Sequence, residues 1–154
     1  SVVSKSNDSC VVLLPHLLDI SHRPDYWGTT RSSRIVIEKM REKYDTAIVA
    51  LGNNANRIKY HQALKENGYT IPTLIHPTAY ISPDAEIAEG CIIRAKVVVS
   101  RYVKIGEATI LNVGALIDHH VEIGYGCHIL MGAVVRNMAK VEPLTRVESL
   151  SLVQ

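Results

Sequence analysis

Several side chains that can exchange protons are concentrated in one short stretch of the chain. Asp118, His119 and His120 are adjacent, Asn112 precedes them, and His128 follows His119 by nine residues. A neutral imidazole can take a proton from an amine or a hydroxyl near neutral pH, and a neighbouring carboxylate can fix its tautomer and raise its basicity. A single histidine on a surface is more often simply solvated, but three of them beside a carboxylate favour general-base chemistry.

These residues lie inside a sequence repeat with a period of six. Fourteen aliphatic residues follow one another at this interval: Ile75, Ile81, Ile87, Ile93, Val99, Ile105, Leu111, Ile117, Ile123, Ile129, Val135, Val141, Val147 and Val153. Four residues after each of the first thirteen comes a small or β-branched residue, from Ala79 to Ser151. Neither a helix nor an alternating strand has this period. The pattern predicts a parallel β-helix of hexapeptide repeats, with three hexads in each triangular coil and about four stacked coils.

The repeat also predicts where the histidines lie relative to one another. A coil of eighteen residues places His119 and His128 on opposite sides of the same section, more than about 10 Å apart at about 3.3 Å per strand residue. They cannot form one site within one subunit, but a symmetric trimer would bring one edge of a subunit to a different edge of its neighbour. We also expect His119 and His120 to point to opposite sides of one strand.

The first half of the chain has the pattern of a small α/β unit. It predicts a helix over Arg34–Tyr44 with Ile35, Ile37 and Met40 on its buried side, and then a buried parallel strand over Thr46–Leu51. A turn at residues 52–54 follows, with an asparagine placed to cap a second helix that runs to about Asn67 and stops at Gly68, and a strand over Thr70–Ile75 completes the unit. We therefore divide the chain into a reduced α/β domain, residues 1–74, and a β-helix domain, residues 75–154.

Gly52, Asn53, Asn54 and Arg57 follow the predicted buried strand, where the next helix begins. In α/β units this junction commonly binds anions and nucleotides. A plain helix cap with a solvated arginine explains the same residues equally well.

Composition narrows the classes of function. The 154 residues, 47% of them hydrophobic, can form one sizeable core and a small second unit, and a net charge of +2 without a basic stripe argues against nucleic acid. Cys10, Cys91 and Cys127 are too scattered for a disulfide framework, which fits a reducing cytoplasm. The apolar stretch from Cys10 to Leu18 is too short for a membrane span, and the residues before it do not have the pattern of a secretory signal, so we expect none. We expect the solenoid glycines, from Gly90 to Gly132, to occupy turns with positive φ.

Three segments carry a resemblance to a known family: AIVALGNNANR, LIHPTAYISPDAEI and LNVGALIDHHVEIGYGCHI. They resemble the sugar acetyltransferases of the sialic-acid O-acetyltransferase and UDP-N-acetylbacillosamine N-acetyltransferase type. The resemblance covers about residues 44–135. It implies a left-handed β-helix, a homotrimer, acetyl-CoA as co-substrate and a nucleotide-binding N-terminal domain.

The resemblance also implies roles for single residues. His119 would be the general base, Asn112 belongs to the same motif, and His128 would contact the thioester end of acetyl-CoA, to whose site we add Gly132. Gly52 would line the sugar-nucleotide site together with Asn53. His120 stands where one branch has an acidic residue, so we expect Asp118 to orient the base instead. The Gly-rich turn expected at the start of the family's fold has no counterpart, since Gly28 is the only earlier glycine.

We therefore expect a trimeric, cytoplasmic acetyltransferase without a metal, in which a sugar or nucleotide-sugar amine or hydroxyl attacks the acetyl thioester directly. A non-catalytic or degenerate trimeric scaffold is the main alternative. A zinc-dependent, carbonic-anhydrase-like enzyme is a further alternative, although the spacing of nine between His119 and His128 does not suit its three-histidine ligand set.

Overall fold

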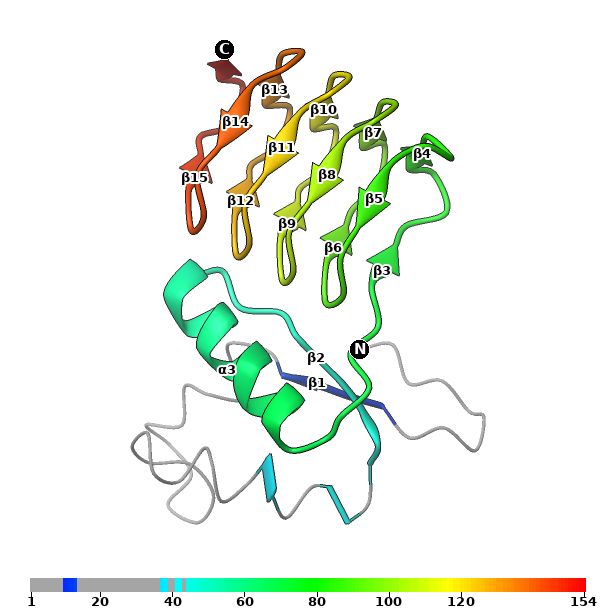
Figure 1. Ribbon diagram of the computed structural model, residues 1–154, viewed down its shortest axis with the longest axis vertical. Coiled ribbons are helices and arrows are strands. Elements are labelled where there is room, and N and C mark those ends of the chain that lie inside the picture. The colour runs from blue at the N-terminus through cyan, green and yellow to red at the C-terminus, as the bar shows by residue number, and fades with distance from the viewer. Residues whose placement is uncertain (1–9, 14–36, 39–40, 43) are drawn as a thin grey trace. The chain divides into compact units, whose positions relative to one another are not determined.

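The computed structural model describes residues 10–13, 37–38, 41–42 and 44–154 (Figure 1). The chain forms two compact units, Ser1–Pro72 and Thr73–Gln154. Each unit is built around a hydrophobic cluster of its own. In the part of the chain that the structure describes, no helix is both long and apolar enough to cross a membrane.

The first unit contains a parallel pair of strands and a helix. Strand β1 (Cys10–Leu13) pairs with β2 (Thr46–Val49), in which Ala47, Ile48 and Val49 are buried as the sequence predicts. Helix α3 (Asn54–Glu66) begins as predicted: the backbone N–H of Asn56 donates to Oδ1 of the N-cap residue Asn53 at 2.9 Å. The helix ends before Gly68, which has φ +73°.

The predicted strand over Thr70–Ile75 is wrong as a single element. Thr70 forms an isolated parallel bridge with Thr46, whereas Leu74 and Ile75 form strand β3 of the second unit. Pro72 lies between them, and a proline has no N–H to donate to a strand ladder.

The predicted helix over Arg34–Tyr44 falls largely outside the described residues. Ile37 and Glu38 are helical, and Ile37 is buried as expected. Ile35, Met40 and Gly28 lie outside the described part.

The second unit is a solenoid of fourteen two-residue strands, as the period of six predicts. They are β3 (Leu74–Ile75), β4 (Tyr80–Ile81), β5 (Glu86–Ile87), β6 (Ile92–Ile93), β7 (Val98–Val99), β8 (Lys104–Ile105), β9 (Ile110–Leu111), β10 (Leu116–Ile117), β11 (Glu122–Ile123), β12 (His128–Ile129), β13 (Val134–Val135), β14 (Lys140–Val141), β15 (Arg146–Val147) and β16 (Leu152–Val153). Each strand pairs in parallel with the strand one coil away, so that Ile117 lies opposite Val99 and Val135.

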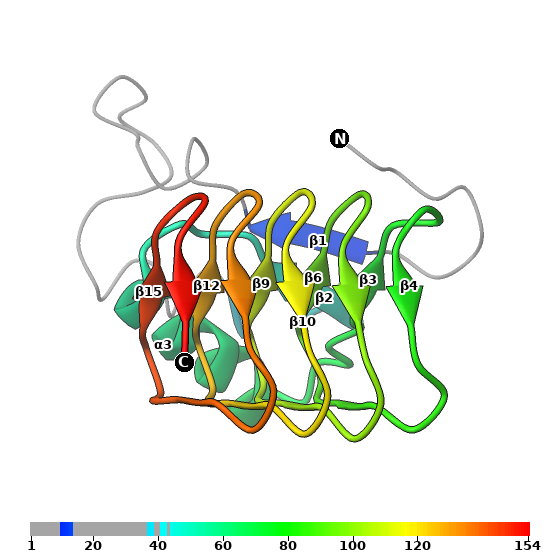
Figure 2. The ribbon, with the colours of Figure 1, turned by 90° about the horizontal axis from the view of Figure 1, so that it is seen from above.

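The strands form three parallel sheets around a common interior (Figure 2). The first sheet holds β3, β6, β9, β12 and β15, the second β4, β7, β10, β13 and β16, and the third β5, β8, β11 and β14. Turns at residues 76–79, 94–97, 112–115, 130–133 and 148–151 join the first sheet to the second and are called here the asparagine corner. Turns at residues 82–85, 100–103, 118–121 and 136–139 join the second sheet to the third and are called the histidine corner.

The repeating aliphatic residues fill the interior, as predicted. Eight in succession are 0–4% exposed: Ile93, Val99, Ile105, Leu111, Ile117, Ile123, Ile129 and Val135. Ile75 departs from this pattern with 48% of its surface exposed, because no coil of the described structure precedes it. The core is thus continuous along the stack and open at its first coil.

At the third corner, where the third sheet leads into the first, small side chains form hydrogen bonds to the main chain. Thr73, Cys91, Thr109 and Cys127 each donate a side-chain hydrogen bond to the carbonyl oxygen fifteen residues later, at 2.8 to 3.2 Å. Cys91 and Cys127 are fully buried free thiols. Their S–H groups therefore also satisfy carbonyl groups where the chain turns.

The glycines of the solenoid have two different roles, and the prediction of positive φ holds for only some of them. Gly90, Gly114, Gly126 and Gly132 have φ between +63° and +71°. Gly106 and Gly124 do not have positive φ. A Cβ atom on Gly106 would lie 2.5 Å from the backbone nitrogen of Tyr125, so this glycine is needed for close stacking of coils.

Candidate active site

Asp118, His119 and His120 form a turn of the histidine corner directly after strand β10. Oδ1 of Asp118 accepts a hydrogen bond from the backbone N–H of His119 at 2.7 Å. His120 has φ +59°, a left-handed conformation that histidine adopts more readily than most residues. The prediction that His119 and His120 point to opposite sides of a strand is therefore wrong, because both lie in the turn.

The two imidazole rings are in direct contact. Nδ1 of His119 and Nδ1 of His120 are 3.0 Å apart, and the ring centroids are 5.2 Å apart with the planes nearly perpendicular. One Nδ1 must carry the hydrogen and the other must accept it. If His119 donates, its Nε2 is left with a lone pair that can accept a proton. This tautomer gives His119 the electronic arrangement of a general base, with His120 as the orienting partner.

Tyr102 extends this ring contact into the preceding coil. Its ring centroid lies 4.9 Å from that of His120, with the planes tilted by 46°. Sequence reasoning did not select Tyr102, although it precedes His120 by eighteen residues, one full coil. That interval was the signal that could have found it.

Asp118 and Asn112 do not contact the His119 ring. The carboxylate of Asp118 binds the main chain of the turn. Asn112 lies at the asparagine corner, where its Oδ1 accepts hydrogen bonds from the Val113 N–H at 2.8 Å and from Nη1 of Arg94 at 2.9 Å. Within one chain, then, neither residue orients the imidazole by direct contact.

His128 and Gly132 lie on other parts of the coil. His128 belongs to β12 of the first sheet, the side opposite the histidine corner, as its spacing from His119 predicts. Its side chain is buried. Gly132 lies at the asparagine corner with φ +64°. One chain alone does not bring these residues to His119.

The residues selected in the first unit surround the start of α3. Gly52 and Asn53 are exposed, and no atom lies within 4 Å of the position that a Cβ on Gly52 would take. Arg57 is fully buried, and its guanidinium donates to the Leu51 carbonyl at 2.6 Å and to Oδ1 of Asn54 at 2.9 Å. The helix cap is thus present, but the solvated arginine of that alternative is wrong, because Arg57 is buried and ties the turn to its helix.

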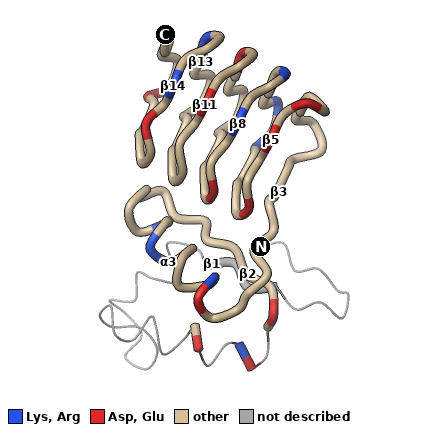
Figure 3. Tube along the Cα trace, viewed as in Figure 1, with Lys and Arg blue, Asp and Glu red and all other residues tan. Residues whose placement is uncertain are grey.

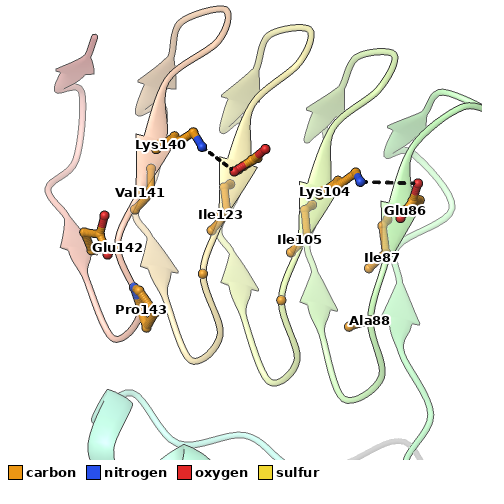
Figure 4. A pocket seen from close by; sticks show the side chains of 13 residues that line it. Glu86, Ile87, Ala88, Lys104, Ile105, Ile123, Lys140, Val141, Glu142 and Pro143 are labelled. Carbon is orange, nitrogen blue, oxygen red and sulfur yellow. Dashed lines mark ion pairs between the residues drawn. The ribbon is translucent and has the colours of Figure 1, made fainter.

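An open groove of about 900 Å³ runs along the third sheet (Figure 4). Its wall carries Glu86, Lys104, Glu122 and Lys140 on successive coils, so that the charge alternates along the sheet (Figure 3). Lys104 lies 4.0 Å from Glu86 and Lys140 lies 3.1 Å from Glu122. These charges are paired with one another.

No protein-family model matches the sequence. Among solved structures, a single-residue variant of perosamine N-acetyltransferase from Caulobacter crescentus, in complex with CoA and GDP-perosamine, is similar to this chain with a TM-score of 0.70 and 25% identity. The match covers 78% of this chain and 66% of that one, so the chain spans slightly less than two thirds of that protein.

Two further similarities point the same way. The acetyltransferase domain of PglB from Neisseria gonorrhoeae has a TM-score of 0.59 and 26% identity, over 78% of this chain and 68% of that one. WeeI from Acinetobacter baumannii is 17% identical with a TM-score of 0.53, over 97% of this chain and 84% of that one, and supports the fold alone. The chain therefore has the left-handed β-helix fold of the sugar N-acetyltransferases, as its resemblance implied.

Proposed function

We propose that this protein is an acetyl-CoA-dependent acetyltransferase that modifies an amine or hydroxyl of a sugar or nucleotide sugar. The observation that carries the proposal is the hydrogen-bonded pair of His119 and His120 at an exposed corner of this fold. The similar perosamine N-acetyltransferase is in complex with CoA and GDP-perosamine, and the PglB domain is also known in complex with acetyl coenzyme A. These contents support the choice of co-substrate and of a nucleotide-sugar acceptor.

The proposed reaction is a direct transfer with His119 as general base. The acceptor nitrogen or oxygen attacks the thioester carbonyl carbon, and its proton moves to Nε2 of His119. The tetrahedral intermediate then collapses, the carbon–sulfur bond breaks, and the CoA sulfur leaves as it takes the proton from His119. His120 accepts the Nδ1 hydrogen of His119 throughout and so keeps Nε2 available. Asp118 holds the turn that carries both rings.

A second copy of the chain would complete this site. The outward positions of the second sheet carry an unbroken apolar stripe of Tyr80, Val98, Leu116, Val134 and Leu152, most of them exposed. Soluble monomers seldom expose a continuous apolar surface of this kind. We place this sheet toward the three-fold axis of a homotrimer.

This orientation would bring the predicted site residues together. The histidine corner and the asparagine corner flank the second sheet on its two sides. If that sheet faces a three-fold axis, the histidine corner of one subunit meets the asparagine corner of the next. Asn112 and Gly132 then approach His119 of the neighbouring subunit, with His128 on the strand that leads into the same corner. Acetyl-CoA would lie along this junction.

Replacement of Leu116 by glutamate is expected to convert the trimer into monomers. Three copies of the new carboxylate would be buried close together at the axis, without partners. Light scattering at micromolar concentration measures the change. Lys104→Gln alters the net charge by the same amount on the third sheet and should leave the trimer intact. A Leu116→Glu protein that stays trimeric would place the interface elsewhere.

The activity itself is tested by release of free CoA from acetyl-CoA, followed with a thiol reagent, in the presence of a panel of amino sugars and nucleotide sugars. Acceptor-dependent release with a matching acetylated product in the mass spectrum is the expected result. A folded trimer that neither binds nor consumes acetyl-CoA with any acceptor would favour the scaffold interpretation.

A further inference from the structure

Two arginines lie on either side of the candidate base along the stack of coils. Arg101 belongs to the preceding turn of the histidine corner, and its carbonyl oxygen accepts a hydrogen bond from the His120 N–H at 3.1 Å. Arg136 belongs to the following turn, where the pairing of Ile117 with Val135 places it beside Asp118. Neighbouring strands lie about 4.8 Å apart, so both backbone positions are one coil from the His119 turn.

Arg101 is also connected to the histidines through side chains. Its Cζ lies 6.0 Å from the ring centroid of Tyr102, and Tyr102 contacts the His120 ring. The guanidinium, the phenol and the two imidazoles therefore form one continuous surface. Arg101, Tyr102 and Arg136 are all exposed, so a ligand can reach this surface without a change in the fold.

Within the part of the chain that the structure describes, the two arginines at this corner outnumber the carboxylates of the turns that carry them, and neither is paired. Among the described residues, neither Arg101 nor Arg136 forms an ion pair or a side-chain hydrogen bond. Asp118 is the one carboxylate in turns 100–102, 118–120 and 136–138, and its Oδ1 accepts the backbone N–H of His119. Asp84 lies in the earliest turn of the corner. The lysines of the third sheet differ, since they are paired with glutamates.

We propose that Arg101 and Arg136 bind an anionic group, a carboxylate or a phosphate, carried by the same sugar that presents the reacting amine or hydroxyl to His119. This inference rests on the proposed function and names a substrate class for the same site. Guanidinium groups match the geometry of both anions. The diphosphate of CoA is a poor alternative, because the whole pantetheine arm separates it from the thioester that must lie at His119.

Binding of simple anionic sugars, followed by the NMR signals of the histidine rings, tests the proposal. The probes are glucuronate with its methyl ester as the neutral control, and glucose 1-phosphate with glucose as the neutral control. The signals are assigned with His119→Ala and His120→Ala. We expect saturable shifts of the His119 and His120 signals with glucuronate or glucose 1-phosphate and none with the neutral sugars. The anion that binds more tightly identifies the group recognised.

The doubly substituted Arg101→Gln, Arg136→Gln protein is expected to bind the anion at least about tenfold more weakly, whereas Lys104→Gln should bind it like the unaltered protein. Both arginines are exposed, and an unchanged thermal midpoint would verify the fold. Equal shifts with neutral sugars, no shift with either anion, or undiminished binding by the double variant would each overturn the proposal.

The binding measurement does not require acetyl transfer, so it tests this inference separately from the proposed function. An inactive protein that binds anions through these arginines would contradict the proposed function alone, and an active one without anion binding would contradict this inference alone.

Discussion

His119→Ala is expected to lower the rate of acetyl transfer by about 10²- to 10⁴-fold, the usual contribution of a general base. His119 is half-buried in a surface turn and lies outside the hydrophobic core, so its removal should leave the thermal midpoint and the affinity for CoA nearly unchanged. Single-turnover measurements with saturating acetyl-CoA and acceptor would separate the chemical step from binding.

Two neighbouring variants serve as controls and distinguish the roles within the turn. His120→Ala removes the acceptor for the Nδ1 hydrogen of His119, so we expect a loss of activity between those of His119→Ala and Asp118→Asn. If the two side chains had pointed to opposite sides of a strand, the expected loss would have been smaller. Asp118→Asn should have a small effect, because an amide Oδ1 can still accept the His119 N–H. If His119→Ala retained full activity while His120→Ala abolished it, the assignment of base and partner would be reversed. If neither change mattered, the scaffold interpretation would gain support.

Ile117→Asp is expected to abolish folding of the solenoid. Ile117 is 1% exposed, and its strand pairs with β7 on one side and β13 on the other. A carboxylate at this position would be buried without a partner at a cost of several kcal/mol, comparable to the whole stability of a domain of this size. Circular dichroism and denaturant unfolding measure the effect.

Leu116→Asp is the matched control, since it introduces the same charge one residue earlier on the outer face of the same strand. It should disturb assembly but leave the coils folded. If Ile117→Asp unfolded at the same denaturant concentration as the unaltered chain, the inward register of this strand would be refuted.

Most of the fold could be predicted from the hexapeptide repeat alone. One side of each short strand must be aliphatic wherever three sheets enclose a common interior, so the positions from Ile93 to Val135 predicted the register of every coil. Only the open first coil, at Ile75, departed from it. The end of the first unit was harder to predict. The pairs Thr70–Ile71 and Leu74–Ile75 both have the composition of a strand, and Pro72 is the one residue in this segment that signals a break between them.

The histidine cluster shows what the sequence could not supply. Its residues were found from their types and spacing. The contact between His119 and His120, however, depends on the left-handed backbone at His120, whereas the alternation of side chains along a strand would place the two rings on opposite faces. In the same way, the burial of Arg57 depends on carbonyl and amide oxygens of its own turn that pattern reasoning does not position. Gly106 and Gly124 lie in turns as expected, but not because of a positive φ. They are needed because the next coil approaches their backbone closely.

The histidine corner differs from the other two in the residues at its left-handed positions. Tyr102, His120 and Met138 occupy all three of these positions, whereas glycine fills two of the four left-handed positions at each other corner. For a residue with a Cβ this conformation costs about 1–2 kcal/mol relative to a right-handed one. A turn without glycine also has fewer alternative backbone conformations available to it. The rings of this corner are consequently preorganised, so that in the proposed reaction His119 would meet its substrate without the entropic cost of ordering a loop.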